Sequence, residues 1–148
     1  MSDGGRERYG APGRPPEAGE RRLYDEALAA AERAYAPYSG FRVGAVAVGA
    51  SGRRRSGVNV ENAASPAGLC AERAVLAALV ADGERELRTV AVAAADGSDC
   101  LPCGLCLQAL AEFGDLELVV RSAGDLVVVR LRELLTAPFV LPGERGDD

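Results

Sequence analysis

Two short segments of the sequence carry thiols at spacings that suit metal chemistry, and the first also carries a carboxylate. They are Cys70-Ala71-Glu72-Arg73 and Pro102-Cys103-Gly104-Leu105-Cys106. Each is predicted to open a helix, where unpaired backbone N–H groups and the helix dipole favour the thiolate form that binds a metal. Three thiolates with a fourth position open are typical of a catalytic zinc site, whereas a closed structural site takes four protein ligands. Cys70, Cys103 and Cys106 are therefore the candidate ligands for one Zn²⁺ per chain.

Glu72 lies two residues after the first candidate ligand. A carboxylate at this spacing can lean over the open metal position without coordinating the ion, take a proton from water and deliver it to a substrate nitrogen. The chain contains no histidine, which excludes every His-based triad, general base and metal ligand. Glu72 is therefore the predicted catalytic residue.

The cysteines also allow other interpretations. A lone C-x-x-C pair serves redox or structural roles in many proteins. Cys100, the fourth cysteine, could replace Cys70 as a ligand or join the other three in a closed structural site. In the remaining interpretation Cys100 is a spare thiol with no part in the site.

The elements that must hold these segments follow from the pattern of apolar residues. Apolar positions from Leu23 to Ala34 repeat at helical spacing, and Pro37 must end that helix. Further helices are predicted at 70–81, 104–113 and 131–135. Strands are predicted at 41–48, 53–60, 89–95, 116–121 and 125–129, of which 89–95 is apolar enough to be covered on both faces. This order predicts an α/β domain of three layers, α/β/α, around a mixed five-stranded sheet.

Length and composition limit the organisation of the chain. Its 148 residues suit one domain, and we expect a disordered leader at 1–20, a catalytic domain at 21–142 and a disordered tail at 143–148. With 17 basic and 22 acidic residues the formal net charge is −5, which speaks against nucleic acid or an anionic membrane as a partner. No signal peptide or membrane-spanning run is evident, so a cytoplasmic location is expected.

The motifs together resemble those of the small, homotetrameric, zinc-dependent cytidine deaminases, in the cytidine and deoxycytidylate deaminase superfamily. Their shared signature is C-x-E followed by P-C-x-x-C. The likeness covers about residues 23–140 and extends to segments 34–45, 59–63, 107–108, 112–114 and 133–135 with Phe139. The resemblance implies a cytidine-deaminase-like fold and hydrolysis of cytidine or deoxycytidine to uridine or deoxyuridine plus ammonia, a step of pyrimidine salvage.

The resemblance also implies how a nucleoside substrate is held. Asn59 and Glu61 would bind the ribose 3′-hydroxyl, which suits an amide and a carboxylate two residues apart because such side chains share one face of a strand. Phe41 would lie against the pyrimidine ring, and the backbone N–H of Ala71 would read the base edge together with Glu72. Taken without that context, Asn59 is a turn residue, Glu61 a solvated charge and Phe41 a core residue.

Two further roles come from the resemblance. Arg73 would donate to the thiolates, because three thiolates leave Zn²⁺ a poor Lewis acid and a nearby cation restores the acidity of bound water. Phe139 would reach into the pocket of a neighbouring subunit in a homotetramer; the alternative is that it covers its own core. The sequence departs from the family at Leu107, where Arg is usual, and at Ser65, where Tyr is usual.

Three other functions compete with this interpretation. The departures at Ser65 and Leu107 leave room for a deaminase of a modified cytosine nucleoside, such as a blasticidin-S-like compound. The second is a non-catalytic module stabilised by zinc, in which the position of Glu72 beside a ligand would have no function. An editor of polynucleotides would need a basic surface with aromatic residues, and the run at 53–55 is instead expected to be a solvated face near a hairpin.

Overall fold

One mixed sheet of five strands forms the centre of the protein. A computed structural model describes residues 10–142, and in it the strands lie in the order β2-β1-β3-β4-β5. They are β1 (Val43–Gly49), β2 (Arg54–Val58), β3 (Leu87–Ala94), β4 (Glu117–Ser122) and β5 (Asp125–Arg130). β3 and β4 run parallel, whereas the other neighbouring strands run antiparallel. The predicted mixed five-stranded sheet is confirmed.

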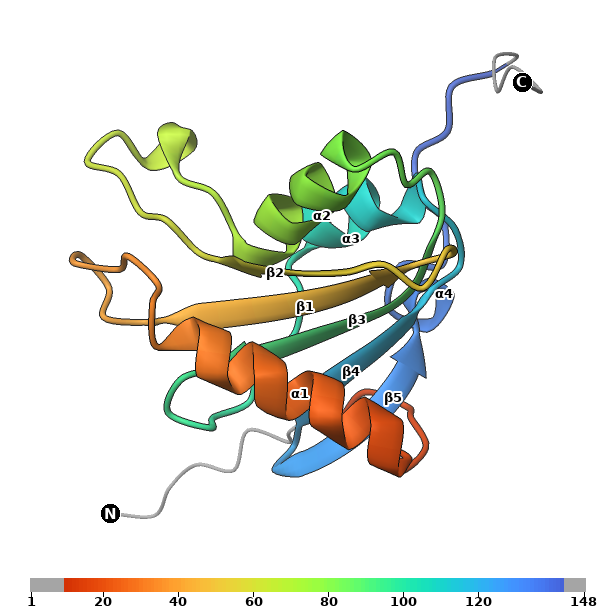
Figure 1. Cartoon of the computed structure of the whole chain (residues 1–148), viewed down its shortest axis with the longest axis horizontal. Coiled ribbons are helices and arrows are strands. Elements are labelled where there is room, and N and C mark those ends of the chain that lie inside the picture. Colours follow the sequence, from red (N-terminus) through yellow and green to blue (C-terminus); the bar gives the residue numbers. More distant parts are fainter. Residues whose placement is uncertain (1–9, 143–148) are drawn as a thin grey trace.

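Helices cover both faces of this sheet, as the three-layer prediction requires (Figure 1). Helix α1 (Ala18–Ala31) packs on one face. On the other lie α2 (Ala71–Ala81), α3 (Gly104–Ala111) and the short α4 (Leu131–Leu134), while the 3₁₀ turn η1 (Ser65–Ala67) lies in the loop before α2. None of the helices within residues 10–142 combines the length and apolarity that a membrane crossing needs.

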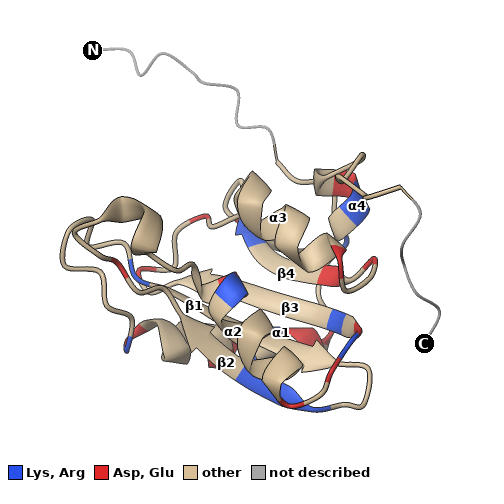
Figure 2. Ribbon diagram, turned by 90° about the horizontal axis from the view of Figure 1, so that it is seen from above, with Lys and Arg blue, Asp and Glu red and all other residues tan. Residues whose placement is uncertain are grey.

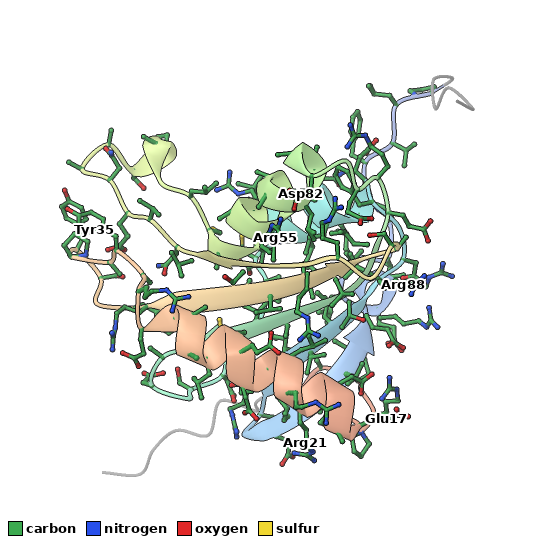
Figure 3. The ribbon with its side chains drawn as sticks, in the orientation of Figure 1. Glu17, Arg21, Tyr35, Arg55, Asp82 and Arg88 are labelled. Atoms are coloured by element: carbon green, nitrogen blue, oxygen red, sulfur yellow. The ribbon has the colours of Figure 1, made fainter. Side chains whose placement is uncertain are left out.

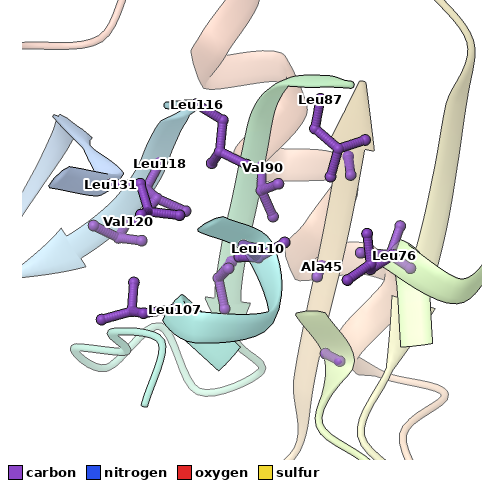
Figure 4. Close-up of a cluster of buried hydrophobic side chains, with 14 of the residues drawn as sticks. Ala45, Leu76, Leu87, Val90, Leu107, Leu110, Leu116, Leu118, Val120 and Leu131 are labelled. Atoms are coloured by element: carbon purple, nitrogen blue, oxygen red, sulfur yellow. The ribbon is translucent and has the colours of Figure 1, made fainter. Parts of the chain in front are cut away.

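The central strand β3 is buried on both faces, as its apolar sequence predicts. Val90 and Val92 belong to the apolar cluster beneath α2 and α3, which Figure 4 shows in part, whereas Ala91 and Ala93 belong to the cluster beneath α1. Because successive side chains of a strand point to opposite faces, this one strand serves both layers. The core thereby fixes the two site-bearing helices on the same side of the sheet.

A glycine sets how closely the first turn of α2 approaches the sheet. A Cβ atom at Gly57 of β2 would lie 2.6 Å from the backbone nitrogen of Val75 and 2.8 Å from the carbonyl oxygen of Ala71. No side chain fits at such distances, so only glycine allows α2 to pack directly on β2. This close approach fixes the helix start at which Cys70 lies.

The N-terminal part of the domain differs from the sequence expectation. α1 begins at Ala18, and before it Arg14 pairs with Val128 of β5 through backbone hydrogen bonds of 3.0 and 2.8 Å. Residues 10–20 were expected to lie in a disordered leader, but Arg14 is paired with the edge strand β5 and residues 18–20 belong to α1. A backbone pairing such as that of Arg14 leaves no apolar signal in the sequence. The remainder of that leader, 1–9, and the tail at 143–148 lie outside the described residues.

The end of α1 also differs from the expectation. The helix stops at Ala31, and the next turn tightens, with the backbone nitrogen of Ala34 donating to the carbonyl of Ala31. The apolar spacing continues to Ala34 because that residue still faces the domain, although the backbone has left the helix. The other predicted elements match the observed ones within two residues.

The basic run at 53–55 lies at the start of β2 and is paired with acidic and backbone groups. Arg53 donates to the backbone carbonyl of Asp82 at 2.5 Å, and Arg55 lies 2.8 Å from the Asp82 carboxylate (Figure 3). Arg54 pairs with Glu26 of α1 at 2.5 Å. Figure 2 shows the blue arginines of β2 close to red acidic segments. The run is therefore part of a mixed-charge surface.

Candidate metal centre and active site

The three thiols predicted as ligands lie together. The Sγ atoms of Cys70, Cys103 and Cys106 are all within 4.8 Å of one another. Cys70 is the N-cap of α2 and Cys103 the N-cap of α3, while Cys106 lies within the first turn of α3. With Zn–S bonds of about 2.3 Å, tetrahedral geometry separates the sulfurs by about 3.8 Å. The donor set therefore fits one zinc ion and leaves a coordination position for a non-protein ligand.

Cys100 is not part of this group. It is buried in the apolar cluster under α2 and α3, and its backbone nitrogen donates to the carbonyl of Arg121 at 3.1 Å. Burial raises the pKa of its thiol to about 12, so the thiol is neutral near pH 7. The structure thus does not bring Cys100 to the other thiols, in agreement with the spare-thiol interpretation.

The thiols differ in their electrostatic surroundings. Burial, followed by the charge of Glu72, raises the pKa of Cys106. Burial also acts to raise the pKa of Cys103, but hydrogen bonds from the backbone of Cys106 and Leu105 and from the Cys106 side chain outweigh it, and the pKa is lowered. A fully buried thiolate at Cys106 needs a cation to share its charge, which a divalent metal ion would supply.

Arg73 provides a positive charge beside the thiols. Its Nη2 lies 3.9 Å from the Sγ of Cys70, one turn back along α2. Hydrogen bonding to Cys70 is the largest cause that raises the pKa of Arg73, with Cys106 contributing as well. Leu107, by contrast, is buried in the apolar cluster (Figure 4) and adds no charge. The predicted position of Arg73 next to the thiols is therefore observed.

Glu72 is buried in the first turn of α2, with a side chain next to the metal group. Only 5% of the residue is exposed. Burial raises the pKa of its carboxyl, and hydrogen bonding to its own backbone and to the Cys106 thiol, with the charge of Arg73, partly opposes that rise. A carboxyl with a raised pKa both accepts and donates a proton more readily near neutral pH. The location and surroundings of Glu72 suit proton transfer.

Asn59 and Glu61 line the same cavity as Cys70 and Arg73. This cavity has a volume of about 490 Å³. It lies between the end of β2, the loop that follows it and the start of α2, and its other lining residues are Tyr38, Val60, Asn62, Ala63, Ser65, Gly68 and Leu69. The candidate ribose ligands therefore share one opening with a metal ligand and its neighbouring cation.

Both residues also order the loop before β1, which the sequence analysis missed. The Asn59 amide donates to the carbonyl of Phe41 at 2.9 Å and accepts from the backbone nitrogen of Val43 at 2.8 Å. Glu61 Oε1 accepts from the backbone nitrogens of Tyr38 and Ser39 at 3.0 and 3.1 Å. Hydrogen bonding to Ser39 is the main cause that lowers the pKa of Glu61. The sequence gives one hint of these contacts: the loop before β1 and the segment with Asn59 and Glu61 both lie in the segments that resemble the cytidine deaminases, 34–45 and 59–63.

The remaining predicted substrate contacts are not gathered at the cavity. Phe41 and Phe139 are 43% and 69% exposed, and neither lines it. Ala71 is fully buried at the start of α2. The exposure of Phe139 disagrees with the alternative that it covers its own core. Contact of these three residues with a substrate stays a prediction.

Comparison with known proteins agrees with this site. The family model described as "Cytidine and deoxycytidylate deaminase zinc-binding region" matches residues 18–122. The cytidine deaminase of Mycobacterium tuberculosis is 42% identical over 118 residues, which are 76% of this chain and 89% of that protein. The cytidine deaminase of Sporosarcina psychrophila is 36% identical over 121 residues, covering 80% of this chain and 89% of the relative.

A solved structure shows the same architecture. The crystal structure of cytidine deaminase from Burkholderia pseudomallei superposes with a TM-score of 0.74 at 40% identity, over 80% of this chain and 98% of that one. The family match, the relatives and this fold agree with the three clustered thiols and the buried Glu72. The chain therefore belongs to the cytidine and deoxycytidylate deaminase family.

Proposed function

We propose that this chain is a zinc-dependent enzyme that hydrolyses cytidine and deoxycytidine to uridine and deoxyuridine, with release of ammonia. The observation that carries the proposal is the group of Cys70, Cys103 and Cys106 with Glu72 buried beside it. The relatives named cytidine deaminase support the choice of substrate. Cys70, Cys103 and Cys106 would hold the metal, and Arg73 would offset part of their charge.

Zinc, when bound, supplies Lewis acidity that activates water at neutral pH. Glu72 accepts a proton from the water whose oxygen bonds to C4 of the cytosine ring, and passes that proton to N3. It then takes the second proton of the water and gives it to the exocyclic amine. The C4–N bond breaks, ammonia leaves, and C4 keeps the oxygen as a carbonyl. One carboxyl that alternates between its two forms thus serves every proton transfer.

The nucleoside would be oriented from the cavity that Asn59 and Glu61 line. Glu61 accepts the two backbone bonds of the loop through Oε1, and its other carboxylate oxygen would accept from a ribose hydroxyl. The Asn59 amide still has one N–H and one lone pair beyond its two backbone bonds. Phe41 would pack on the base, and the N–H of Ala71 would donate to its edge. Binding at the ribose would then hold C4 in position for attack.

Ser65 supports a second candidate substrate class, the modified cytosine nucleosides. It lines the cavity in the loop before α2, and a serine there occupies less space than the tyrosine usual in the family. Bulkier substituents on the base or sugar would therefore be accepted. An ordinary furanose remains favoured by the Asn59 and Glu61 pair.

We further propose a cytoplasmic homotetramer that acts in pyrimidine salvage. Phe139, Val140 and Leu141 follow one another and are 69%, 53% and 70% exposed, and a contiguous exposed apolar stretch of this kind suits contact with another chain. Four free cysteines without a disulfide are also typical of a reducing compartment such as the cytoplasm. Light scattering tests the assembly. A fully active monomer of about 15 kDa would contradict sites shared between subunits.

A substrate panel tests the activity itself. The zinc-loaded chain is incubated with cytidine, deoxycytidine, cytosine, CMP, adenosine and blasticidin S, and loss of the substrate chromophore is followed by ultraviolet absorbance. We expect fast turnover of the two ordinary nucleosides and slow turnover of free cytosine, which lacks the ribose. Activity on blasticidin S alone would select the second candidate, and no turnover of any cytosine compound would refute the deaminase proposal.

A further inference from the structure

Gln108 connects the helix that bears two of the thiols to the C-terminal aromatic residue. It lies on α3, two residues after Cys106, and its side chain is half-buried. Its Nε2 donates to the backbone carbonyl of Phe139 at 2.9 Å, and the backbone nitrogen of Phe139 donates to its Oε1 at 2.8 Å. The amide therefore pairs with both backbone groups of one residue, as a neighbouring strand would.

This pairing is the main polar attachment of the C-terminal segment. After α4 ends with the nitrogen of Leu135 bonded to the carbonyl of Leu131, residues 136–142 form no helix or strand. Within the described part of the chain, the hydrogen bonds of residues 136–142 are the two to Gln108. Without them, this stretch would be held to α3 by packing alone and would sample many backbone conformations.

The paired backbone contrasts with an exposed side chain. The Phe139 ring is left in solvent, although its backbone is fixed in both its donor and its acceptor. Fixing the Phe139 backbone costs conformational entropy, and the exposed ring gains no burial within the described chain in return. We therefore expect the ring to be held in place for contact with another molecule. Because Cys106 and Gln108 lie on the same short helix, the hydrogen bonds of Gln108 fix the position of the Phe139 backbone relative to the three thiols.

We propose that Gln108 is a positioning residue of the deaminase: its amide fixes the Phe139 backbone on α3, so that the ring meets the nucleoside at a set place relative to the thiols. This inference rests on the proposed function. It assigns Gln108 no contact with substrate or metal. Its effect on the reaction passes through Phe139, whether the ring serves its own site or that of a second copy of this chain.

Hydrogen exchange of the Phe139 backbone amide tests the attachment without any assay of activity. In Gln108→Ala we expect exchange to be at least about 10-fold faster, because the acceptor that residues 10–142 offer to that N–H is removed. Gln108→Glu keeps an acceptor but loses the donor to the carbonyl, so an intermediate rate is expected. Glu112→Ala, at an exposed position at the end of α3, serves as the matched control. Parental exchange in Gln108→Ala would overturn the proposal.

Kinetics of the zinc-loaded chains test the route through Phe139. We expect Gln108→Ala and Phe139→Ala to lower kcat/KM for cytidine by similar factors, with unchanged zinc content, and the double variant to be no worse than the poorer single variant. Losses that multiply in the double variant, or a fully active Phe139→Ala chain, would refute the positioning role. A parent chain inactive on cytidine would instead refute the deaminase function, and the exchange rates would still decide whether Gln108 fixes Phe139.

Discussion

The side-chain amide of Asn59 donates a hydrogen bond of 2.9 Å to the backbone carbonyl of Phe41. The same amide accepts from the nitrogen of Val43, the first residue of β1, at 2.8 Å. A residue proposed to bind the sugar is thus also the brace for the residue proposed to pack on the base. Substrate binding and local stability are expected to change together at this position.

Replacing Asn59 should therefore weaken the fold as well as the reaction. Asn59→Ala leaves the Val43 N–H without its acceptor, and we expect the free energy of unfolding to fall by about 1–3 kcal/mol together with a strong loss of kcat/KM. Asn59→Asp keeps that acceptor, so it should recover part of the stability. Urea unfolding and cytidine kinetics measure the two effects. A stable but inactive Asn59→Ala chain would show that the brace contributes nothing.

Leu107 should not tolerate the arginine usual in the family. The side chain is 6% exposed within an apolar cluster, and an unpaired charge there is expected to lower the free energy of unfolding by about 3–5 kcal/mol. Leu105→Arg is the matched control, because Leu105 lies on the same helix and is 61% exposed. Thermal unfolding compares the two. Equal stability of both variants would mean that the cluster holds an acceptor for the guanidinium.

Glu84 gives a pH dependence whose sign follows from its contacts. The buried carboxylate accepts from the hydroxyl of Ser51, and this hydrogen bond is the main cause that lowers its pKa from 4.5. A lowered folded-state pKa means that the carboxylate stabilises the fold above about pH 4.5 and that this contribution is lost as the pH falls through the folded value. Glu84→Gln should therefore be less stable than the parent at pH 7.

The stability difference between the parent and Glu84→Gln should shrink in acid. Urea unfolding from pH 7 to pH 3, with the exposed Glu86→Gln as control, measures it. Once the pH falls through the lowered pKa of Glu84, the protonated carboxyl resembles glutamine, so the two curves should approach each other. A difference that stays constant or widens as the pH falls would show that the Ser51 contact does not favour the charged form.

The four cysteines should separate into two classes by metal content. Cys70→Ala, Cys103→Ala and Cys106→Ala each remove one of three clustered donors and are expected to lose most of the bound zinc. Cys100→Ala should retain one zinc per chain, because that thiol lies apart in the apolar cluster. Metal analysis of purified variants checks this. Loss of zinc in Cys100→Ala would show that the proposed set of zinc ligands is wrong.

The sheet and the thiol cluster could be predicted because their signals are local. The apolar run that became β3 indicates a strand covered on both faces, and thiols at two helix starts indicate a shared metal. Three other features depend on groups distant in sequence: Gly57 beneath α2, the bridge from Arg14 to Val128, and the pairing of Gln108 with Phe139. Glycine, backbone and amide contacts of this kind leave no periodic pattern in a single sequence.

The dual role of Asn59 shows the same limit within the site. Its contact with the sugar is implied by the resemblance to the cytidine deaminases, and its spacing from Glu61 suits that role. Its bonds to Phe41 and Val43 form only when the loop before β1 folds back on β2. The sequence thus indicates which residues gather at the site, whereas the hydrogen bonds between them depend on the tertiary fold.

We propose above that Glu72 transfers protons beside a zinc ion held by three thiols. Glu72→Gln preserves the shape of the side chain and removes its acid–base chemistry. The direct measurement is the rate of cytidine deamination by this variant, normalised to zinc content. We expect one zinc per chain, an unchanged fold and a rate at least about 10²–10⁴-fold below that of the parent. A zinc-loaded Glu72→Gln chain that deaminates cytidine at a near-parental rate would contradict this account.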